Sequence, residues 1–565
     1  MTGVIASMVN SRLILDVYLL TCVLINLSTE RADSIEVSSV QNGSRDFVLE
    51  GDAGAKTELI LAAASDSAAG GFTWAAPSAT LNRRRTWLDT FDWRLYRAGL
   101  TLEQVVSRGR TELVLTGRDG EVLAQAQLTD GGRLHWPSLI SALPAGPLRE
   151  QLEPVVGVRA LLAIARATSR VRERRALNGD DKTIARLFTD QMAVTYPVRA
   201  AAAPRLTLMP LRGYHGQADR VGRALSNLPG VTNGNAPTLD IALRAADRRP
   251  GELTGKAAAV RLRGSTPATR ALATTLTALF DALEANVPGT ISDIDTEFLH
   301  DLRIAVRWTR SAIKLCGGAL PDGVARRFRP EFRWLGDLTT PTRDLDVYLL
   351  GYASMSAALV GATEAELTPF HDYLTRSRKA AHTHLLRGLR SARFARLRDE
   401  WGDALADMKA SRRRTTVAQL AAEQIKAAQR RALAAGRSIT PASPAESLHD
   451  LRKRCKELRY LVEMFGSLHD PSQRWQAVRE LKALQDCLGE FQDAEVQRAE
   501  IHAFAAQMLA DRSAPAATLL AMGEIAAGLA LRQYQARNDF DSRFAAFASR
   551  SSQARLSALA KSTIA

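Results

Sequence analysis

The sequence contains little of what catalysis or secretion ordinarily requires. Only four of its 565 residues are cysteine, and none forms a CxxC pair, so a reducing compartment is favoured over a disulfide-rich secreted protein. No P-loop, GxSxG, HExxH or Ser/His/Asp arrangement is visible. Aromatic residues make up 6% of the chain, which weighs against a binder of single-stranded nucleic acid, because such proteins stack bases on aromatic side chains.

Long apolar runs are also scarce. The run nearest the N-terminus extends from Leu13 to Leu27 and is interrupted by Asp16 and Asn26, whereas a membrane-spanning helix needs about 20 consecutive apolar residues. The run lacks the small-residue cleavage site of a signal peptide. We therefore expect no membrane partner, and we predict that residues 1–50 are a leader that is disordered or precedes the true start of translation.

Positive charge is what the chain has in excess. It contains 75 Lys and Arg against 60 Asp and Glu, a formal net charge of +15. Such a balance indicates a polyanionic partner, which could be nucleic acid, an anionic membrane surface or a phosphate polymer. Charge alone does not choose among these three.

One pentapeptide occurs twice. Leu-His-Asp-Leu-Arg stands at 299–303 and returns 149 residues later at 448–452. The same register aligns Arg307 with Lys456 and Asp344 with Asp493, which indicates an internal duplication. Segments rich in Ala, Leu, Arg and Glu, about 20–30 residues long and separated by Gly and Pro, predict an all-helical region of two similar antiparallel bundles.

The repeated helix carries its basic residues in a narrow row. The i, i+4, i+7 spacing places three arginines within about 60° of one another. In the first copy the row consists of His300, Arg303, Arg307, Arg310 and Lys314. In the second copy it consists of His449, Arg452, Lys456 and Arg459, and Glu463 replaces the counterpart of Lys314. Apolar residues flank both rows, so each row is predicted to face a partly enclosed groove that requires anions.

The anions could come from the protein or from outside it. The duplicated partner segments supply carboxylates at Asp344, Asp346, Asp493 and Glu495. From His300 to Arg329, however, seven Lys and Arg stand against two Asp and Glu. Pairing within the segment cannot neutralise that excess, and an external anion is favoured.

These helices resemble the repeats of the CHAD family, named for a histidine in an α-helical domain. The resemblance covers about residues 265–550 and rests on 299–303, 335–337 and 343–347 with their second-copy counterparts. It implies two four-helix bundles around a pseudo-two-fold axis, with inorganic polyphosphate bound in a basic cavity between them. The cavity residues that it implies are His300, Arg303, Arg307, Arg310, His449, Arg452, Lys456 and Arg459, with Lys314 and Lys453 as additions.

Polyphosphate suits such rows because it offers one negative charge per unit and no bases to read. Arg grips phosphate with a planar fork and Lys with a mobile point charge. Neither His300 nor His449 has a second His or Cys three or four residues further on, so a metal site is not indicated. A histidine beside phosphate would instead gain charge, and affinity would rise at lower pH.

The first half of the chain has a different residue pattern, with short apolar runs separated by Gly and polar residues. The stretches 57–63, 111–116 and 122–128 read as strands, with Asp119-Gly120 as a hairpin turn between the last two. Residues 158–175 before the turn Asn178-Gly179 read as further strand and hairpin or as a helix end. Residues 51–230 therefore predict an antiparallel sheet with a few helices.

This half resembles the CYTH, or triphosphate-tunnel, family at 56–60, 87–90, 157–167 and 208–214. The resemblance implies a closed antiparallel β-barrel in which carboxylates hold a divalent metal and basic residues hold phosphate. Its Glu-x-Glu-x-Lys motif falls on Lys56, Glu58 and Ile60, and a cation in place of a ligand repels a metal. We therefore expect no catalysis and no cofactor, with Mg²⁺ required only if this domain is active.

Other basic residues of this half have two readings. Arg170, Arg172 and Arg174 alternate, so on a strand they share one face, which is either a solvated outer face or a tunnel wall that holds phosphate together with Glu58. The consecutive Arg83, Arg84 and Arg85 cannot all face inward, and we expect them to be solvated.

The sequence thus predicts a multi-domain α+β and all-α chain: a leader at 1–50, a triphosphate-tunnel-like barrel at 51–230, a linker at 231–265, helical repeats at about 266–410 and 411–550, and a tail at 551–565. The predicted function is non-enzymatic binding of polyphosphate, in the cytoplasm and, as the family implies, on polyphosphate granules. One alternative is a metal-dependent triphosphate or polyphosphate hydrolase that uses the barrel. Another is binding to a nucleic-acid backbone, without sequence-specific recognition.

Overall fold

The structure is a computed structural model that describes residues 44–50, 57–66, 71–128, 134–234, 237–252, 255–257, 260–409 and 415–560. Most of the predicted leader therefore lies outside the described residues, as does Lys56. Residues 43–565 form one compact unit, and everything below belongs to it. Within the described residues, no helix combines the length and the apolar character needed to cross a membrane.

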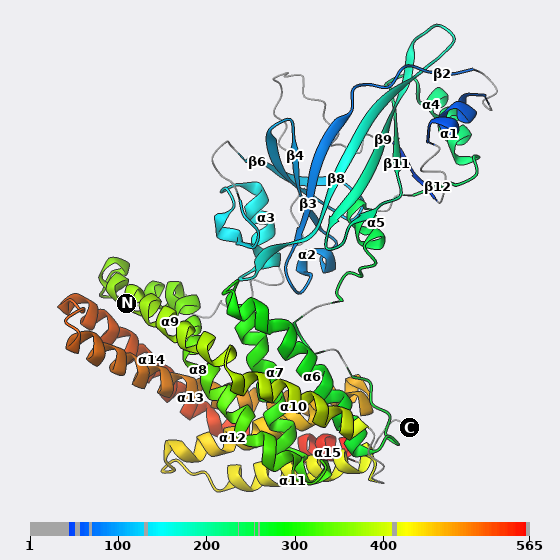
Figure 1. Cartoon of the computed structure of the whole chain (residues 1–565). Helices are drawn as coiled ribbons and strands as arrows, with labels where there is room; N and C mark the ends of the chain where they lie inside the picture. The colour runs from blue at the N-terminus through cyan, green and yellow to red at the C-terminus, as the bar shows by residue number, and fades with distance from the viewer. Residues whose placement is uncertain are drawn as a thin grey trace. The chain divides into compact units, whose positions relative to one another are not determined.

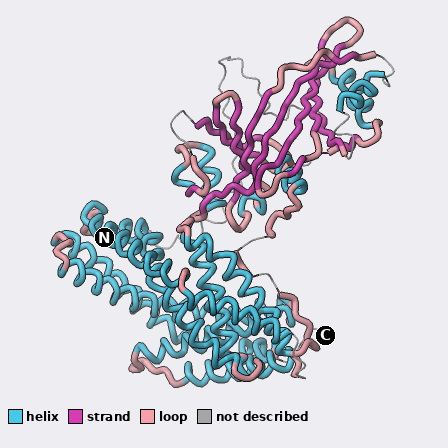
Figure 2. Tube along the Cα trace, in the orientation of Figure 1, coloured by secondary structure: helices cyan, strands magenta, loops and turns pink. Residues whose placement is uncertain are grey.

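The first region is an antiparallel sheet, drawn in magenta in Figure 2. Its strands are β1 (Arg45–Leu49), β2 (Thr73–Trp74), β3 (Leu81–Asp89), β4 (Thr101–Ser107), β5 (Arg110–Thr116), β6 (Val122–Leu128), β7 (Ser138–Leu139), β8 (Ala160–Leu177), β9 (Thr183–Tyr196), β10 (Ala200–Ala201), β11 (Arg205–Pro210) and β12 (Val231–Asn233). The strand order is β12-β1-β11-β9-β8-β3-β4-β5-β6, with β2, β7 and β10 attached beside it. The antiparallel sheet is confirmed. Among the described residues the end strands β12 and β6 do not pair, so closure into a barrel stays a prediction.

One predicted strand is wrong. The stretch 57–63 belongs to the helix α1 (Thr57–Asp66). Its buried residues are Thr57, Leu61 and Ala64, which follow the i, i+4, i+7 spacing of a helix face, whereas Leu59 is 66% exposed. This face packs into the core of the sheet region. Glu58 is consequently not on a first strand.

The other short helices of this region cover the sheet and its ends (Figure 1). They are α2 (Arg94–Arg97), the 3₁₀ turn Ile140–Ala142, α3 (Pro147–Val156), α4 (His215–Ser226) and α5 (Thr238–Ala245). Part of the predicted linker is therefore structured, because β12 pairs with β1 and the apolar residues of α5 join a buried cluster. Similarly, β1 lies inside the predicted leader. Elements this short give too few periodic residues to outweigh the nearby Gly and Pro.

The second region is helical, as predicted, and is drawn from green to red in Figure 1. Its helices are α6 (Ala268–Ile291), α7 (Thr296–Leu315), α8 (Val324–Ala357), α9 (Glu364–Leu389), α10 (Ala392–Lys409), α11 (Val417–Arg437), α12 (Ala445–Met464), α13 (Pro471–Ala510), α14 (Ala516–Ala548) and α15 (Arg550–Leu559). Successive helices pack against each other within α6–α9 and within α11–α14. The sets meet through α6 with α11, α7 with α12 and α9 with α14. The predicted tail includes α15, in which Leu556 is fully buried.

The two motif helices keep the register of the duplication to their ends. Helix α7 is followed by the 3₁₀ turn Gly317–Ala319, and α12 by Gly466–Leu468, at the equivalent positions. Cys316 and Cys455 are buried in the shared helical core, as expected of small packing residues. The N-termini differ, because the Asp295 side chain accepts hydrogen bonds from two backbone amides of α7 whereas Pro444 offers α12 no such cap.

Candidate anion-binding surface

The two predicted basic rows lie on helices that pack against each other. The ring centroids of Trp308 on α7 and Tyr460 on α12 lie 5.0 Å apart. Lys314 Nζ forms an ion pair with Glu457 Oε1 at 2.6 Å, which joins the first row to the second copy. We call the ten predicted side chains the basic surface: His300, Arg303, Arg307, Arg310, Lys314, His449, Arg452, Lys453, Lys456 and Arg459.

Arg303 is held in place without being neutralised. Its Nη1 donates to Gly336 O at 3.2 Å and to the hydroxyl oxygens of Thr339 at 2.9 Å and Thr340 at 2.8 Å, all on α8. Burial lowers the pKa of Arg303, the nearby Asp344 opposes that effect, and Arg307 adds to it. Neutral acceptors fix the guanidinium, and Asp344 offsets part of its charge without forming an ion pair with it.

The next two arginines of the first row project more freely. Arg307 and Arg310 are exposed, and neither forms an ion pair with any described residue. Arg310 passes over α8 at Gly336, where a Cβ atom would lie 2.5 Å from Arg310 Nη1. The glycine of the motif at 335–337 therefore makes room for a member of the basic surface, a role that its spacing alone did not reveal.

The second row is paired more often. Arg452 Nη2 lies 2.9 Å from Asp493 Oδ1, Arg459 Nε lies 3.3 Å from Glu463 Oε1, and Lys453 Nζ lies 3.3 Å from Asp450 Oδ1. Pairing does not use all the donors, however. The Nε atom of Arg452 is buried and has no hydrogen-bond partner among the described residues. A buried donor without an acceptor costs free energy that an incoming anion would recover.

Lys456 lies where the two rows approach each other. Burial lowers its pKa to about 8, and the positive charges of Arg452, Arg307 and Arg459 add to the shift while Asp493 opposes it. Among the described residues it forms no ion pair. Arg307 comes from the other copy, and it precedes Trp308, whose ring contacts that of Tyr460, the neighbour of Arg459; the two rows therefore approach each other there.

The two histidines have different neighbours. Arg343 and Gln492 occupy equivalent positions in the duplication. His449 Nδ1 is hydrogen-bonded to Gln492 Oε1, whereas burial and the charge of Arg343 lower the pKa of His300. His300 will therefore gain its proton at a lower pH than an ordinary histidine, and the first copy is the more positive at this position.

The predicted carboxylates of the protein serve several purposes. Asp493 pairs with Arg452, but Asp346 accepts from Arg378 Nε at 2.9 Å, away from the basic surface. Burial raises the pKa of Asp344, with Arg303 opposing the shift. Only part of the basic surface is thus compensated from within.

Sequence reasoning missed Arg159, which reaches the motif from the sheet region. Arg159 is fully buried immediately before β8 and lies against three carboxylates: Asp301 at 2.5 Å, Asp295 at 3.2 Å and Asp92 at 3.6 Å. Asp301 is the aspartate of the repeated pentapeptide, and Asp295 caps α7. We call these four side chains the Arg159 cluster. They fix one side of α7 while the basic row occupies another.

Of the predicted tunnel residues, Glu58 and Arg174 form an ion pair, whereas Arg170 and Arg172 are exposed on β8. Glu58 lies on α1 and has 63% of its side chain exposed. Arg172 Nε donates to Thr80 Oγ1 at 2.9 Å. Within the described ranges, His, Cys, Asp and Glu side chains form no group of three that could hold a metal ion. The residues at the predicted motif therefore do not fit a Mg²⁺ site.

The expectation that all three consecutive arginines are solvated is wrong for Arg83 and Arg85. These two alternate onto a half-buried face of β3, and only Arg84 is exposed. Arg85 lies 3.0 Å from Asp190 and also pairs with Glu103. Strand alternation places side chains i and i+2 on one face, so two of three consecutive residues can share an inner face.

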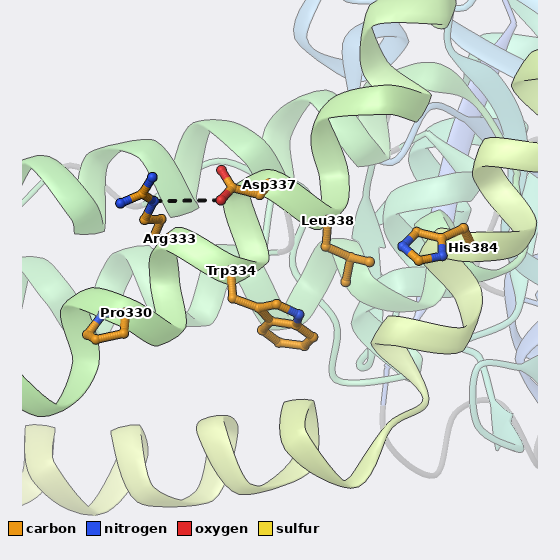
Figure 3. A pocket seen from close by; sticks show the side chains of 6 residues that line it. All are labelled: Pro330, Arg333, Trp334, Asp337, Leu338 and His384. Atoms are coloured by element: carbon orange, nitrogen blue, oxygen red, sulfur yellow. Dashed lines mark ion pairs between the residues drawn. The ribbon is translucent and has the colours of Figure 1, made fainter.

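A separate open groove of about 430 Å³ lies on α8 and α9 (Figure 3). Its lining residues are Pro330, Arg333, Trp334, Asp337, Leu338 and His384. Arg333 is partnered by Asp337 at 3.8 Å, and the guanidinium of Arg393 lies 4.4 Å from the centre of the Trp334 ring. The groove therefore adds little uncompensated charge.

The helical region combines an internal duplication with a basic surface. Residues 274–502, which include both motif helices, match the family model for the CHAD domain. No curated protein matches the sequence.

Solved structures are similar to parts of the chain. The CHAD domain from the plant Ricinus communis has 22% identity and a TM-score of 0.45, covering 52% of this chain and 96% of that one. PptA from Streptomyces chartreusis has 18% identity and a TM-score of 0.39, with 49% and 99% covered. An adenylyl cyclase-like protein from Hippeastrum, reported with a dominant triphosphatase activity, has 12% identity and a TM-score of 0.24, with 37% and 98% covered.

Proposed function

We propose that this protein binds inorganic polyphosphate on the basic surface and does so without catalysis. The observation that carries the proposal is that the two helices with the cationic rows contact each other, at Trp308 with Tyr460 and at Lys314 with Glu457, while Arg307 and Lys456 form no ion pair among the described residues. Such a surface suits a ligand of high, regular negative charge. Guanidinium forks and a mobile ammonium can grip successive phosphates without reading any base. Association with polyphosphate granules would follow from the same binding.

The direct test is a titration of the full chain with long-chain polyphosphate at several salt concentrations. The logarithm of the binding constant should fall linearly with the logarithm of the salt concentration, because bound phosphates release counterions. An affinity that ignores salt would refute binding through these cations.

The pH dependence of binding should report on Lys456. Its pKa of about 8 in the free protein must rise beside a polyanion, so binding takes up a proton at this residue. The affinity for polyphosphate is therefore highest below the free pKa and decreases as the pH rises above it. The decrease is roughly tenfold between about pH 8 and 9.5 if the pKa of bound Lys456 returns to the ordinary value. Lys456→Arg keeps its charge throughout and should give a nearly flat curve in this window. Parallel curves for the two proteins would contradict the assignment.

The hydrolase alternative gains no support from the sheet region. Arg85 is neutralised by Glu103 and Asp190, and Glu58 lies on the exposed side of α1, where it pairs with Arg174. We expect no release of phosphate from tripolyphosphate or polyphosphate with Mg²⁺ or Mn²⁺. Turnover by the wild-type chain that Glu58→Gln abolishes would replace the present proposal with an enzyme.

A further inference from the structure

Lys456 has the surroundings of a reactive amine as well as those of a binding residue. Arg452 and Arg459 lie one turn before and after it on the same face of α12, and α7 adds Arg307. From α13, Asp493 is the opposing charge, and its Oδ1 is already 2.9 Å from Arg452 Nη2. On α11, Arg431 is directed to Glu457. The amine thus stands among cations with no carboxylate of its own.

The same cluster is equipped to hold a phosphate group. The buried Nε atom of Arg452 has no hydrogen-bond partner among the described residues. Arg459 Nε lies 3.3 Å from Glu463 Oε1, and Arg307 is exposed and forms no ion pair with a described residue. A phosphate next to these guanidiniums would bring whatever it carries close to the Lys456 nitrogen. Holding the reactants together in this way converts a bimolecular encounter into a local one.

We infer that Lys456 is a site of self-acylation by small acyl phosphates, of which acetyl phosphate is the simplest. This inference rests on the proposed anion-binding function of the same surface. The neutral amine attacks the acyl carbon, a nitrogen–carbon bond forms, and the carbon–oxygen bond to phosphate breaks. The electron pair leaves with inorganic phosphate, which the arginines stabilise, and the nitrogen loses a proton to solvent. No oxidant or reductant is needed.

Lys453 provides an internal comparison on the same helix. Its side chain is 59% exposed and its Nζ lies 3.3 Å from Asp450 Oδ1. A neighbouring cation activates a lysine nucleophile by favouring the neutral amine, and a carboxylate has the opposite effect. If exposure alone determined the rate, Lys453 would be acylated faster. If the cations around Lys456 determine it, Lys456 is acylated faster.

The size of the difference follows from the protonation states. At about pH 7.5 an amine with the pKa of Lys456, about 8, is neutral about two hundred times as often as an ordinary lysine. Its intrinsic nucleophilicity is about tenfold lower if amines follow the dependence known for thiols. The expected net advantage is about twentyfold before any contribution from phosphate binding.

The consequence for the protein is a loss of charge. Acylation turns the Lys456 ammonium into a neutral amide and removes a donor from the point where the rows converge. Acylated protein should bind polyphosphate more weakly, and polyphosphate bound first should protect Lys456. A metabolic acyl phosphate would thereby compete with the polymer for this surface.

The test is to incubate the full chain with acetyl phosphate and to follow each lysine by mass spectrometry. At about pH 7.5 Lys456 should be acylated about twentyfold faster than Lys453, and the ratio should fall to one or below near pH 10.5, where an ordinary lysine is itself about half neutral. Arg307→Gln should slow Lys456 several-fold, whereas Arg220→Gln on the distant helix α4 should not. Equal or faster acylation of Lys453 at pH 7.5 would overturn the inference.

Two further measurements test separately the role of the phosphate group in acylation and the binding of polyphosphate. An uncharged acetyl ester should favour Lys456 less than acetyl phosphate does, and equal selectivity would overturn the role of the phosphate. Polyphosphate affinity is measured on the same preparations. If the chain binds polyphosphate but its lysines are acylated without selectivity, this inference alone is wrong. If Lys456 is acylated selectively but the chain does not bind polyphosphate, the proposed function is wrong.

Discussion

Replacing Arg159 with methionine should lower the free energy of unfolding by about 3–5 kcal/mol, the usual cost of removing one partner from a buried charge network. Arg159 is fully buried, and Asp92, Asp295 and Asp301 have at most 3% of their side chains exposed. Without the guanidinium, Asp295 and Asp301 would lose the buried charge that faces both, and Asp92 would keep only its ion pair with Arg94. Urea unfolding followed by circular dichroism measures the change.

The duplication supplies a matched control for this prediction. Asp450 is the second-copy equivalent of Asp301, but its side chain is 62% exposed and pairs with Lys453. Asp301→Asn should be strongly destabilising, whereas Asp450→Asn should change stability by no more than about 1 kcal/mol, as for other exposed pairs. Similar losses for the two aspartate variants, or a stable Arg159→Met protein, would show that the Arg159 cluster does not hold α7.

Reversing Arg307 and Lys456 together to glutamate should weaken polyphosphate binding by about 150-fold or more. Two charge-assisted hydrogen bonds at about 1.5 kcal/mol each account for that factor, and repulsion by the new carboxylates adds to it. Neither residue forms an ion pair with a described residue, so the fold should survive. The affinity is measured by calorimetric titration, with circular dichroism as the check on folding.

Arg220→Glu with Arg223→Glu is the control for the same change in net charge. Both arginines are exposed on α4, in the sheet region. This variant should keep its affinity within a few-fold of the wild-type value, because exposed charges more than about 10 Å from the ligand are screened by salt. An equal loss in both double variants would mean that net charge, rather than the basic surface, governs binding.

Arg303 is a poorer choice for charge reversal. Its Nη1 donates to the backbone of Gly336 and to the hydroxyls of Thr339 and Thr340. A glutamate there would lose these bonds to α8 and place an acceptor against acceptors. A loss of binding in such a variant would not distinguish disturbed packing of α7 from the loss of a ligand contact.

The helical half could be predicted from the sequence because its information is local and is given twice. The repeated pentapeptide fixes the register, and the i, i+4, i+7 spacing fixes the row on each helix. The 3₁₀ turns after α7 and α12 keep the same offset. Spacing could not show which cations are paired, since Lys314 finds Glu457 on a helix of the other copy.

The sheet half was harder because its determinants are nonlocal. Arg159 meets Asp295 and Asp301 across 136 and 142 residues of sequence, a separation that no local pattern encodes. The face of Arg85 depends on the register of β3 against its neighbours, because a shift by one residue would reverse it. At α1, the letters of a family motif suggested a strand, but burial follows a helical stripe.

The most direct test of the account is a competition between long-chain polyphosphate and duplex DNA at matched phosphate concentration and moderate salt. A surface built for successive phosphates without bases should prefer the flexible polymer, because its chain can follow the two rows while the duplex presents phosphates at fixed spacing. We predict that polyphosphate displaces the duplex from the wild-type chain and loses this advantage in the Arg307→Glu/Lys456→Glu variant. Displacement of polyphosphate by the duplex would contradict the account and indicate a nucleic-acid-binding protein.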